Sequence, residues 1–545
     1  MTLRIGIDFD NTIACYDAAF QECAKTLNYI PAGQVSSKQE IKKAILMQPD
    51  GETKWQRVQG LVYGKFISYA TLFPGVAEFL WRCRVAGAEV FIVSHKTDYG
   101  HFDDEKINLR EAAREWMLKH EFFSESKFAI SSRNLFFEYT REEKVKKIST
   151  LNLDFFIDDL TEVLTESSFP LQTKKILFAS DISNGVNQLS DIEVCQSWQQ
   201  ISLAVLGHVT EGHALTIAQL LWPELGLTQI CAISGRGNSR VFQLSAADKT
   251  KYALKQYPNL QIDPRPRLET EFKVCTLLHA RGLPVANAVA KDMSLNWGLY
   301  DWLDGVDIGV NRLELFSQVA DFVGALAILG SEIDCGNFPA ASEACFSGAE
   351  IERQISTRLI ALKTVGRPDV EKFLDDQLMP VYNQALTRAK TLLGSSFDNE
   401  IKQSERMLSP SDFGFHNMKV SDTSRLVFYD FEYFGWDDPV KLISDSLWHP
   451  GMNLDEEEAQ VWFTTIRPLF PEMPNFDLRF RCLYPLFGIR WALILLNEFV
   501  RAKLKNRVNA DPGKQFSIEA IQARQLEKAE LLLGRVRKFA VLKLE

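Results

Sequence analysis

The sequence predicts an α/β domain with a parallel sheet, followed by a different fold that begins with β-type runs and continues with helices. Its length of 545 residues corresponds to two to four domains at about 150 residues each. Over residues 1–185, short apolar runs alternate with helical patterns, which is typical of a parallel sheet with helices on both faces. From residue 207 onward the β-type runs come first and helical patterns follow.

The first domain is expected to contain buried strands, because each apolar run ends abruptly in polar residues. These strands are Leu3–Phe9, Val90–Val93 and Phe155–Ile157. Apolar positions recur at helical spacing in three segments, Val76–Ala86, Lys106–His120 and Arg141–Leu151. Residues 14–70 form a polar, mostly helical stretch between the first strand and the first of these helices.

Acidic and hydroxyl side chains follow these strands, at the sheet edge where α/β proteins bind ligands. Asp8 and Asp10 lie two residues apart, so they can act as nucleophile and as general acid or base. With Asp158, they can form a Mg²⁺ site of oxygen ligands. Ser94 can hold phosphate oxygens, and Lys144 can balance the charge of the nucleophile and a phosphoryl group.

This pattern resembles the haloacid-dehalogenase-like (HAD) phosphatases, with four motifs in the family's order over about 180 residues. The motifs are DFDNT at residues 8–12, Ser94, Lys144, and the pair Asp158-Asp159. The resemblance implies a HAD-like Rossmannoid fold, with Asp8 as the phosphorylated nucleophile, Asp10 as the acid/base and Thr12 in support. Lys146 and Lys147 are alternatives for the third motif. The family's helical cap would be residues 14–70, and an acid at Asp10 disfavours dehalogenase chemistry.

A polar segment between Asp181 and Gly207 predicts a linker at residues 186–206. After it come three β-type runs, Thr228–Ser234, Arg240–Leu244 and Tyr252–Gln256. The sequence GRGNS, residues 235–239, joins the first two, and such a glycine-containing loop can lie over nucleotide phosphates. Lys255 on the third run and Glu271 on the following helix can form an ion pair that holds the lysine on those phosphates.

The second half of the chain supplies matching groups for phosphoryl transfer. In SPSDFGFHN, Asp412 is followed five residues later by Asn417, and the apolar strand LVFYD ends in Asp430. A carboxylate that accepts the acceptor's hydroxyl proton, together with Asn and Asp ligands for Mg²⁺, is what transfer from bound ATP requires.

These features resemble the aminoglycoside phosphotransferase and choline kinase superfamily, over about 320 residues. The resemblance implies a two-lobed protein-kinase-like α+β fold, with a small lobe at about 207–303 and a large lobe at about 304–545. It implies a set of ATP-binding residues: Gly235, Gly237, Asn238, Ser239, Lys255 and Glu271. Asp412 would be the catalytic base, and Asn417 and Asp430 the Mg²⁺ ligands. Residues Gly298–Gly305 would be the hinge that meets adenine.

Two positions depart from the family's pattern. The usual His-Gly before the catalytic aspartate is Pro410-Ser411 here, and the structural aspartate after Asp438-Pro439 is Leu442, with Asp445 one turn later. Neither departure removes a group that performs chemistry.

The remaining patterns of the second half predict mainly core. Three segments have helical spacing and are expected to be buried: Phe316–Leu329, Ile351–Leu362 and Tyr484–Val500. The stretch from Ile518 alternates charges and predicts a solvated amphipathic helix. Five residues after the Asp430 strand either line an acceptor pocket or pack beneath the loop: Trp436, Asp437, Asp438, Trp448 and His449.

Composition bounds the function classes. Hydrophobic residues make up 46% and charged residues 24%, as in soluble globular proteins. With 61 Lys and Arg against 71 Asp and Glu, the net charge is −10, which disfavours a broad nucleic-acid surface. The nine cysteines are scattered, without Cys-x-x-Cys, so neither a zinc site nor a disulfide framework is indicated. No signal peptide or membrane insertion is expected, and a cytoplasmic location fits.

Together these features predict a bifunctional enzyme: a Mg²⁺-dependent HAD-type phosphomonoesterase and an ATP-dependent kinase. The substrates are expected to be small polar metabolites, such as a sugar or polyol of a surface-polysaccharide or related carbohydrate pathway. One alternative is a nucleic-acid end-processing kinase-phosphatase, which the acidic charge and the lack of GxxxxGK[ST] disfavour. A non-catalytic, ligand-sensing scaffold is the other alternative.

Overall fold

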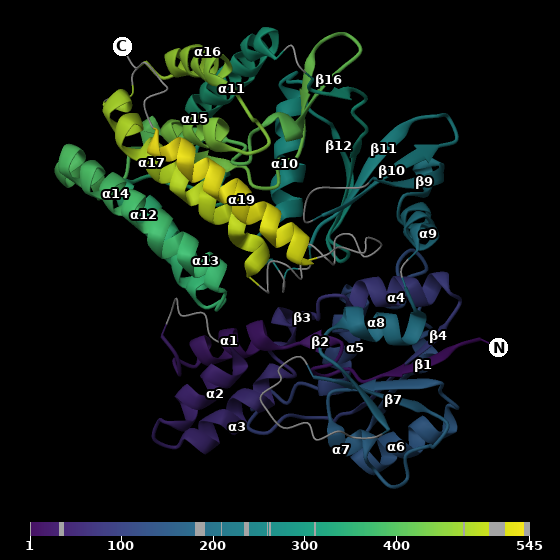
Figure 1. The fold of residues 1–545 in the computed structure, drawn as a ribbon. Helices are drawn as coiled ribbons and strands as arrows, with labels where there is room; N and C mark the ends of the chain where they lie inside the picture. Colours follow the sequence, from purple (N-terminus) through teal and green to yellow (C-terminus); the bar gives the residue numbers. More distant parts are fainter. Residues whose placement is uncertain are drawn as a thin grey trace. The chain divides into compact units, whose positions relative to one another are not determined.

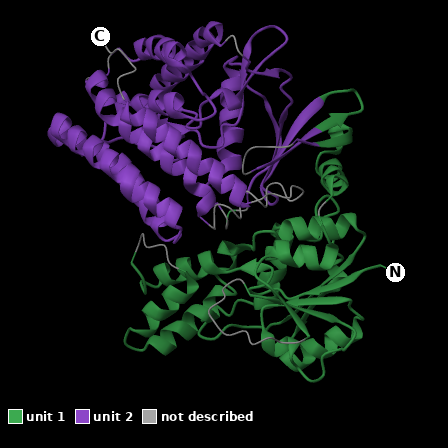
Figure 2. Cartoon of the chain, viewed as in Figure 1, with its two compact units in different colours: residues 1–231, 244–250, 259–261 green, residues 232–243, 251–258, 262–545 purple. Residues whose placement is uncertain are grey.

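The chain forms two compact units (Figures 1 and 2). The structure is a computed structural model that describes residues 2–31, 37–179, 191–208, 210–233, 239–258, 260, 263–309, 312–471, 473, 475–500 and 518–538. Unit 1 comprises residues 1–231, 244–250 and 259–261, and unit 2 comprises residues 232–243, 251–258 and 262–545.

Unit 1 is built on a six-stranded sheet in the order β5-β4-β1-β6-β7-β8. The pairings between neighbouring strands are parallel. The strands are β1 (Arg4–Ile7), β4 (Glu89–His95), β5 (Leu135–Glu138), β6 (Phe155–Asp158), β7 (Lys174–Phe178) and β8 (Ile192–Cys195). The three runs expected to be strands become β1, β4 and β6, which are neighbours in the centre. The sequence patterns did not predict β5, β7 and β8, in which charged residues adjoin or interrupt short apolar runs.

Helices connect many of these strands, and several of them lie in the segment between β1 and β4. That segment contains the short pair β2 (Ala14–Cys15) and β3 (Thr71–Leu72). The helices are α1 (Asp17–Thr26), α2 (Lys38–Leu46), α3 (Gly51–Val62), α4 (Val76–Val85), α5 (Leu109–Lys119), α6 (Arg141–Thr150), α7 (Thr161–Leu164), α8 (Trp198–Leu206) and α9 (Glu211–Leu221). The helical stretch at 14–70 thus contains α1, α2 and α3.

The segment predicted as a linker, 186–206, differs from that prediction in its described part. Residues 192–195 are strand β8 and residues 198–206 are helix α8. Trp198 is 1% exposed, and its indole Nε1 donates to the Thr12 carbonyl at 3.1 Å. Arg82 donates to the carbonyls of Leu206 and Gly207 at the end of α8. The polar composition of this segment predicted a linker because only a few of its side chains are buried. Those few are enough to pack the segment against the rest of unit 1.

The second part of the chain begins with a five-stranded sheet in the order β12-β13-β11-β10-β9, and the division between the units runs through its first strands. Its strands are β9 (Leu227–Ile233), β10 (Arg240–Ala246), β11 (Lys251–Gln256), β12 (Ala288–Asp292) and β13 (Trp297–Asp301). Strand β13 pairs antiparallel with β11 and β12. Smaller antiparallel sheets contain β14 (Val306–Asp307), β15 (Met407–Ser409), β16 (Met418–Val420), β17 (Leu426–Phe428) and β18 (Gly435–Asp437).

Helices make up most of the rest of unit 2. They are α10 (Arg267–Ala280), α11 (Phe316–Glu332), α12 (Gly348–Lys363), α13 (Pro368–Lys372), α14 (Met379–Leu393), α15 (Pro439–Trp448), α16 (Glu456–Ile466), α17 (Phe476–Leu495) and α19 (Ile518–Arg537). Helices α17 and α19 lie side by side (Figure 1). The C-terminal helix is therefore less solvated than predicted: Ala529, Leu532, Leu533 and Val536 are buried.

Two helical segments among the described residues are long and apolar enough to span a membrane, judged by length and composition. They are Leu313–Glu332 and Phe476–Phe499, and 39% and 72% of their most apolar windows are buried inside the protein. The second contains α17, whose buried residues belong to the main core of unit 2. Such burial is expected of a core helix, and core helices of soluble proteins can also be long and apolar enough to meet these criteria of length and composition.

Candidate functional sites

In unit 1, a buried lysine joins two aspartates at the carboxyl ends of adjacent strands. Lys144 Nζ lies 2.6 Å from Asp8 Oδ1 and 2.7 Å from Asp158 Oδ2, and its side chain is 0% exposed. Because β1 and β6 are parallel neighbours, the residues that follow them meet at one edge of the sheet. Helix α6 supplies the lysine in its first turn, which a capping box of Thr140 and Glu143 fixes.

Burial shifts two acids of this site, Asp8 and Asp159, towards their protonated forms. It raises the pKa of Asp8 to about 6, against the opposing effect of Lys144. Burial likewise raises the pKa of Asp159 to about 8, reinforced by the charge of Asp8. Carboxylate oxygens of Asp8, Asp158 and Asp159 all lie within 4.8 Å of one another. An oxygen donor set of this kind suits Mg²⁺, which also favours the ionised carboxylates.

Asp10 lies outside that carboxylate group and has partners of its own. Lys96 Nζ approaches its two oxygens at 2.9 and 2.8 Å, and the Tyr16 hydroxyl donates to it at 2.6 Å. The Asp10 side chain is 20% exposed, so it is more accessible than Asp8. Sequence reasoning missed Lys96, although it lies two residues after Ser94.

The other predicted residues of unit 1 lie at the same sheet edge. Ser94 is 1% exposed near the end of β4, adjacent to β1. Thr12 Oγ1 donates to Asp159 Oδ1 at 3.4 Å, which links the DFDNT loop to the fourth motif. Of the three candidate lysines, Lys144 is the one that contacts Asp8, whereas Lys147 pairs with Glu138 at 3.8 Å.

In unit 2, a second buried lysine is surrounded by three carboxylates. Lys255 Nζ lies 2.7 Å from Glu271 Oε2, 2.5 Å from Asp430 Oδ1 and 3.1 Å from Glu432 Oε2. The three acids form a group whose oxygens lie within 4.8 Å of one another. Strand β11, helix α10 and the loop after β17 each supply part of this cluster, so residues as distant in sequence as Lys255 and Glu432 meet here.

The surrounding residues fix the acids of this cluster. Arg267 donates to Glu432 Oε1 at 2.7 Å, and the Tyr257 hydroxyl donates to Glu271 Oε2 at 2.8 Å. Ser239 Oγ donates to Glu432 Oε2 at 3.2 Å, which brings the end of the GRGNS segment to the cluster. Three other predicted phosphate-loop residues lie outside the described residues: Gly235, Gly237 and Asn238.

Asp430 is the most accessible acid of the cluster, with a side chain that is 33% exposed. Burial of its carboxyl raises its pKa to about 7, although Lys255 acts in the opposite direction. Its backbone φ of +69° lies in the left-handed region, which non-glycine residues rarely adopt and which is common at functional sites. Sequence reasoning gave no role to Glu432, which lies two residues further along in the sequence Asp-Phe-Glu.

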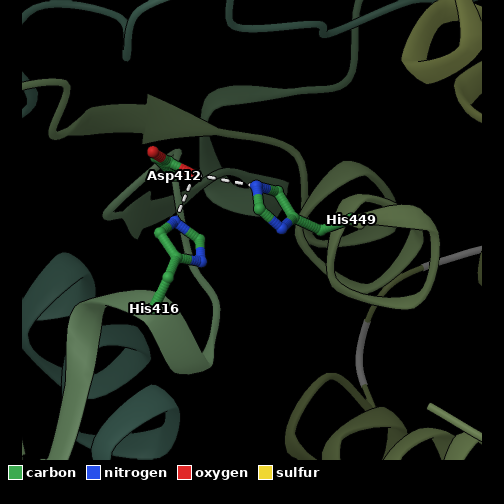
Figure 3. Close-up of side chains that lie close together, drawn as sticks. All are labelled: Asp412, His416 and His449. Carbon is green, nitrogen blue, oxygen red and sulfur yellow. Dashed lines mark hydrogen bonds and ion pairs between the residues drawn. The ribbon is translucent and has the colours of Figure 1, made fainter. Parts of the chain in front are cut away.

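The predicted base, Asp412, lies on the loop between β15 and β16, with two imidazoles beside it (Figure 3). His416 Nε2 is 3.1 Å and His449 Nε2 is 3.5 Å from the same oxygen, Oδ1. Asn417 Nδ2 donates to the Asp412 carbonyl at 2.9 Å. Burial alone would raise the pKa of Asp412, but the hydrogen bond from His416 holds it below its ordinary value.

Pro410-Ser411, the departure before Asp412, forms a defined turn. Ser411 has a φ of +67°, and its hydroxyl donates to the Ser342 carbonyl at 2.8 Å. The backbone N–H of Asp412 donates to the Pro410 carbonyl at 2.9 Å. The local bonds therefore fix the start of the loop without the His-Gly of the family pattern.

Most of the residues offered as an acceptor pocket are buried instead. Four of the five are at most 6% exposed: Trp436, Asp437, Asp438 and Trp448. The fifth, His449, contacts Asp412. Both carboxylate oxygens of Asp445 accept from Nη2 of Arg490, at 2.7 Å each. It therefore anchors α17 to α15 and is a structural residue.

No family model matches the chain, and no curated protein matches it. Its structure is similar to choline kinase LicA from Streptococcus pneumoniae, with 13% identity, coverage of 59% of this chain and 98% of that one, and a TM-score of 0.40. It is also similar to an ethanolamine kinase of Plasmodium vivax, with 12% identity, coverage of 64% of this chain and 97% of that one, and a TM-score of 0.41. A third similar structure is spectinomycin phosphotransferase in complex with ADP and spectinomycin, with 10% identity, coverage of 61% of this chain and 99% of that one, and a TM-score of 0.42. Because these TM-scores lie below 0.5, the roles of individual residues are assigned from the contacts within this chain.

Proposed function

We propose that unit 2 is a Mg²⁺-dependent phosphotransferase that moves the γ-phosphoryl group of ATP to a hydroxyl of a small polar molecule. The observation that carries this proposal is Lys255, whose ammonium group lies between Glu271 and Asp430 at 2.7 and 2.5 Å. A lysine fixed in this way can bind phosphate oxygens, and the accessible acid beside it can bind the accompanying metal ion.

The donor set fits magnesium, which proteins bind through oxygen ligands. We assign Asp430 and Asn417 as its ligands. Glu271 and Glu432 are less available, because Tyr257 and Arg267 already donate to them. When bound, Mg·ATP supplies the phosphoryl group and neutralises charge on the phosphates.

Asp412 is assigned as the base that accepts the proton of the acceptor hydroxyl. Its lowered pKa keeps the carboxyl ionised at neutral pH, which a proton acceptor requires. Lys255 would orient the phosphate oxygens, and Glu271 would hold the lysine in place.

The test is phosphoryl transfer from radiolabelled ATP by the full chain, with Mg²⁺ and a panel of sugars, polyols and amino alcohols. We expect transfer to at least one acceptor by the wild type and its loss in Asp412→Ala, with Mg·ATP affinity nearly unchanged. Asp422→Ala, at an exposed position of the same segment, is the matched control. ATP binding without transfer to any acceptor would favour a ligand-sensing scaffold, and transfer to a nucleic-acid end would favour the end-processing alternative.

A second candidate function, for unit 1, is a phosphomonoesterase, favoured by the contacts of Lys144 with Asp8 and Asp158. Lys144 contacts Oδ1 of Asp8, so we assign Oδ2 as the nucleophile. Oδ2 would attack phosphorus while the ester P–O bond breaks, and Asp10 would give its proton to the leaving oxygen. Water would then hydrolyse the aspartyl phosphate. Asp8 and Asp158 would hold Mg²⁺, with Asp159 and the DFDNT loop beside them.

Hydrolysis of p-nitrophenyl phosphate tests this second function. We expect the full chain to release phosphate with Mg²⁺ and Asp8→Asn to lose this activity, while Asp104→Asn, at an exposed position, keeps it. Retained hydrolysis in Asp8→Asn would exclude the aspartyl-phosphate mechanism. Because opposite reactions at one position would only hydrolyse ATP, we infer that the two units act on different positions or on successive intermediates.

A further inference from the structure

The imidazoles of His416 and His449 both face one oxygen of Asp412 (Figure 3). His416 Nε2 makes a hydrogen bond of 3.1 Å to Oδ1, and His449 Nε2 approaches the same atom at 3.5 Å. The two rings stack, with centroids 4.3 Å apart and planes 10° apart. Among the described residues, the other oxygen of Asp412, Oδ2, has no hydrogen-bond or ion-pair partner.

A backbone contact fixes where His449 carries its proton. The N–H of Gly451 donates to His449 Nδ1 at 2.9 Å, so Nδ1 is an acceptor and the proton of the neutral ring lies on Nε2. Burial lowers the pKa of His449 to about 4, in keeping with a neutral ring. In His416 the nitrogen that faces the carboxylate, Nε2, is the donor, and Nδ1 has no partner within the described part of the chain.

The same three side chains have the composition of a metal site, since their ligand atoms lie within 4.8 Å of one another. Histidines that bind a metal nearly always donate their other ring N–H to a carboxylate, carbonyl or water. Neither ring does so here: Nδ1 of His449 receives an N–H, and Nδ1 of His416 has no partner among the described residues. The arrangement therefore matches donation to Asp412 better than metal binding.

The surroundings leave little room for the rings to turn. A Cβ added at Gly414 would lie 2.8 Å from His416 Nδ1, and one added at Gly451 would lie 2.9 Å from His449 Nδ1. The ring of Trp491 packs against His449 in a T-shaped arrangement, with centroids 4.5 Å apart. The Tyr429 hydroxyl donates to the backbone carbonyl of His416 at 2.8 Å. Two glycines thus provide the space for the imidazoles, and two aromatic residues hold them.

We propose that His416 and His449 are positioning residues that donate N–H groups to Oδ1 of Asp412, so that Oδ2 is the oxygen presented to the acceptor hydroxyl. The proposal rests on the phosphotransferase function of unit 2. It assigns a role to two imidazoles that lie downstream of the base and that the sequence patterns did not connect to it. His416 makes the shorter contact and is the stronger of the two.

The proton positions can be measured without any substrate. The full chain contains eight histidines, and ¹⁵N-labelling of histidine, with His416→Gln and His449→Gln for assignment, reports which ring nitrogen is protonated. We expect both rings to carry the proton on Nε2 at pH 7.5, and both signals to shift in Asp412→Ala. A proton on Nδ1 in either ring, signals unchanged in Asp412→Ala, or stoichiometric Zn²⁺ binding that requires both histidines would overturn the proposal.

Kinetics then separate positioning from a general structural role. The probe is ATP turnover, with water as the acceptor until an organic acceptor is identified. His416→Phe keeps a ring but removes the donor, and it should lower kcat by about 10- to 100-fold, as misplacement of a reacting group does, with KM for Mg·ATP unchanged. His449→Phe should have a smaller effect. His416→Gln, which retains an N–H donor, should recover most of the loss.

The deciding comparison uses Asp412→Ala as the background. If the histidines act through Asp412, His416→Phe should cause no further loss of turnover there. A full additional loss in that background, or a Gln variant no better than Phe, would overturn the positioning role. If the wild type shows no ATP turnover, the phosphotransferase function fails, and with it the role in catalysis, whereas the tautomers still report whether the hydrogen bonds exist.

Discussion

Each unit places a lysine among carboxylates, but the two clusters differ in how far they open to solvent. In unit 1, Lys144, Asp8 and Asp158 have side chains that are 0%, 6% and 0% exposed. In unit 2, Lys255 is 10% exposed and its partner Asp430 is 33% exposed. Asp8, in the enclosed cluster, has little solvent-accessible surface, whereas the Asp430 side chain, in the open cluster, is accessible to solvent. Similar charge groups can therefore contribute differently to stability and to binding.

The largest expected effect is the separate loss of the two activities. Asp8→Asn should remove phosphomonoester hydrolysis, and Asp430→Ala should remove phosphoryl transfer, each by at least about a hundredfold, as expected when a group that stabilises the transition state is lost. Each variant serves as the control for the other unit. Loss of both activities in one variant, measured in parallel assays, would contradict the assignment of one site to each unit.

Removal of the enclosed lysine should mainly destabilise the fold. Lys144→Met leaves Asp8 and Asp158 buried without their cation, which typically costs about 3–5 kcal/mol. Lys147→Met, on the same helix, removes a partly exposed pair with Glu138 at 3.8 Å and should cost at most about 1 kcal/mol. Chemical denaturation of both variants measures the difference in the free energy of unfolding. An equal loss in the free energy of unfolding of both variants would show that burial of the Lys144 pairs does not contribute to stability.

The raised pKa values predict a pH dependence of the metal-free protein. Burial raises the pKa of Asp8 to about 6 and that of Asp430 to about 7, from 3.8. Over this range these two carboxyls hold more protons in the folded chain than in the unfolded chain, so their contribution to the free energy of unfolding should fall as the pH rises from about 4 to 7. Since Mg²⁺ favours the ionised carboxylates, it should raise Tm more at pH 8 than at pH 5. Thermal unfolding with EDTA or Mg²⁺ at both pH values tests this, and equal gains would contradict it.

The smallest effect concerns the helices that carry the two clusters. Helix α6, with Lys144, begins with the capping box of Thr140 and Glu143, whereas α10, with Glu271, begins without a side-chain cap. Thr140→Ala should cost about 1 kcal/mol of stability. Thr150→Ala, at the other end of α6 and exposed, should cost less. If denaturation shows a negligible loss of stability in Thr140→Ala, the capping box does not stabilise α6, and the ion pairs of Lys144 are sufficient to fix the helix.

The sequence predicted the parts of the sites that follow from local rules. Asp8 and Asp158 follow apolar runs, so their meeting at one sheet edge could be expected. It could not predict partners contributed by distant segments. Lys96 reaches Asp10 across 86 positions, and no periodic pattern connects His449 with Asp412. The linker prediction at 186–206 differed from the structure for the same reason, since Trp198 bonds to Thr12 across 186 positions.

The phosphotransferase assignment depends above all on Asp430 and Lys255 forming a Mg·ATP site, and calorimetry of nucleotide binding to the full chain tests this. We expect that the wild type binds ATP in the presence of Mg²⁺ and that Asp430→Ala binds it poorly. Lys255→Ala should weaken binding, while Asp412→Ala should leave it nearly unchanged. Absence of nucleotide binding by the wild type, or unchanged binding by Asp430→Ala, would contradict the assignment.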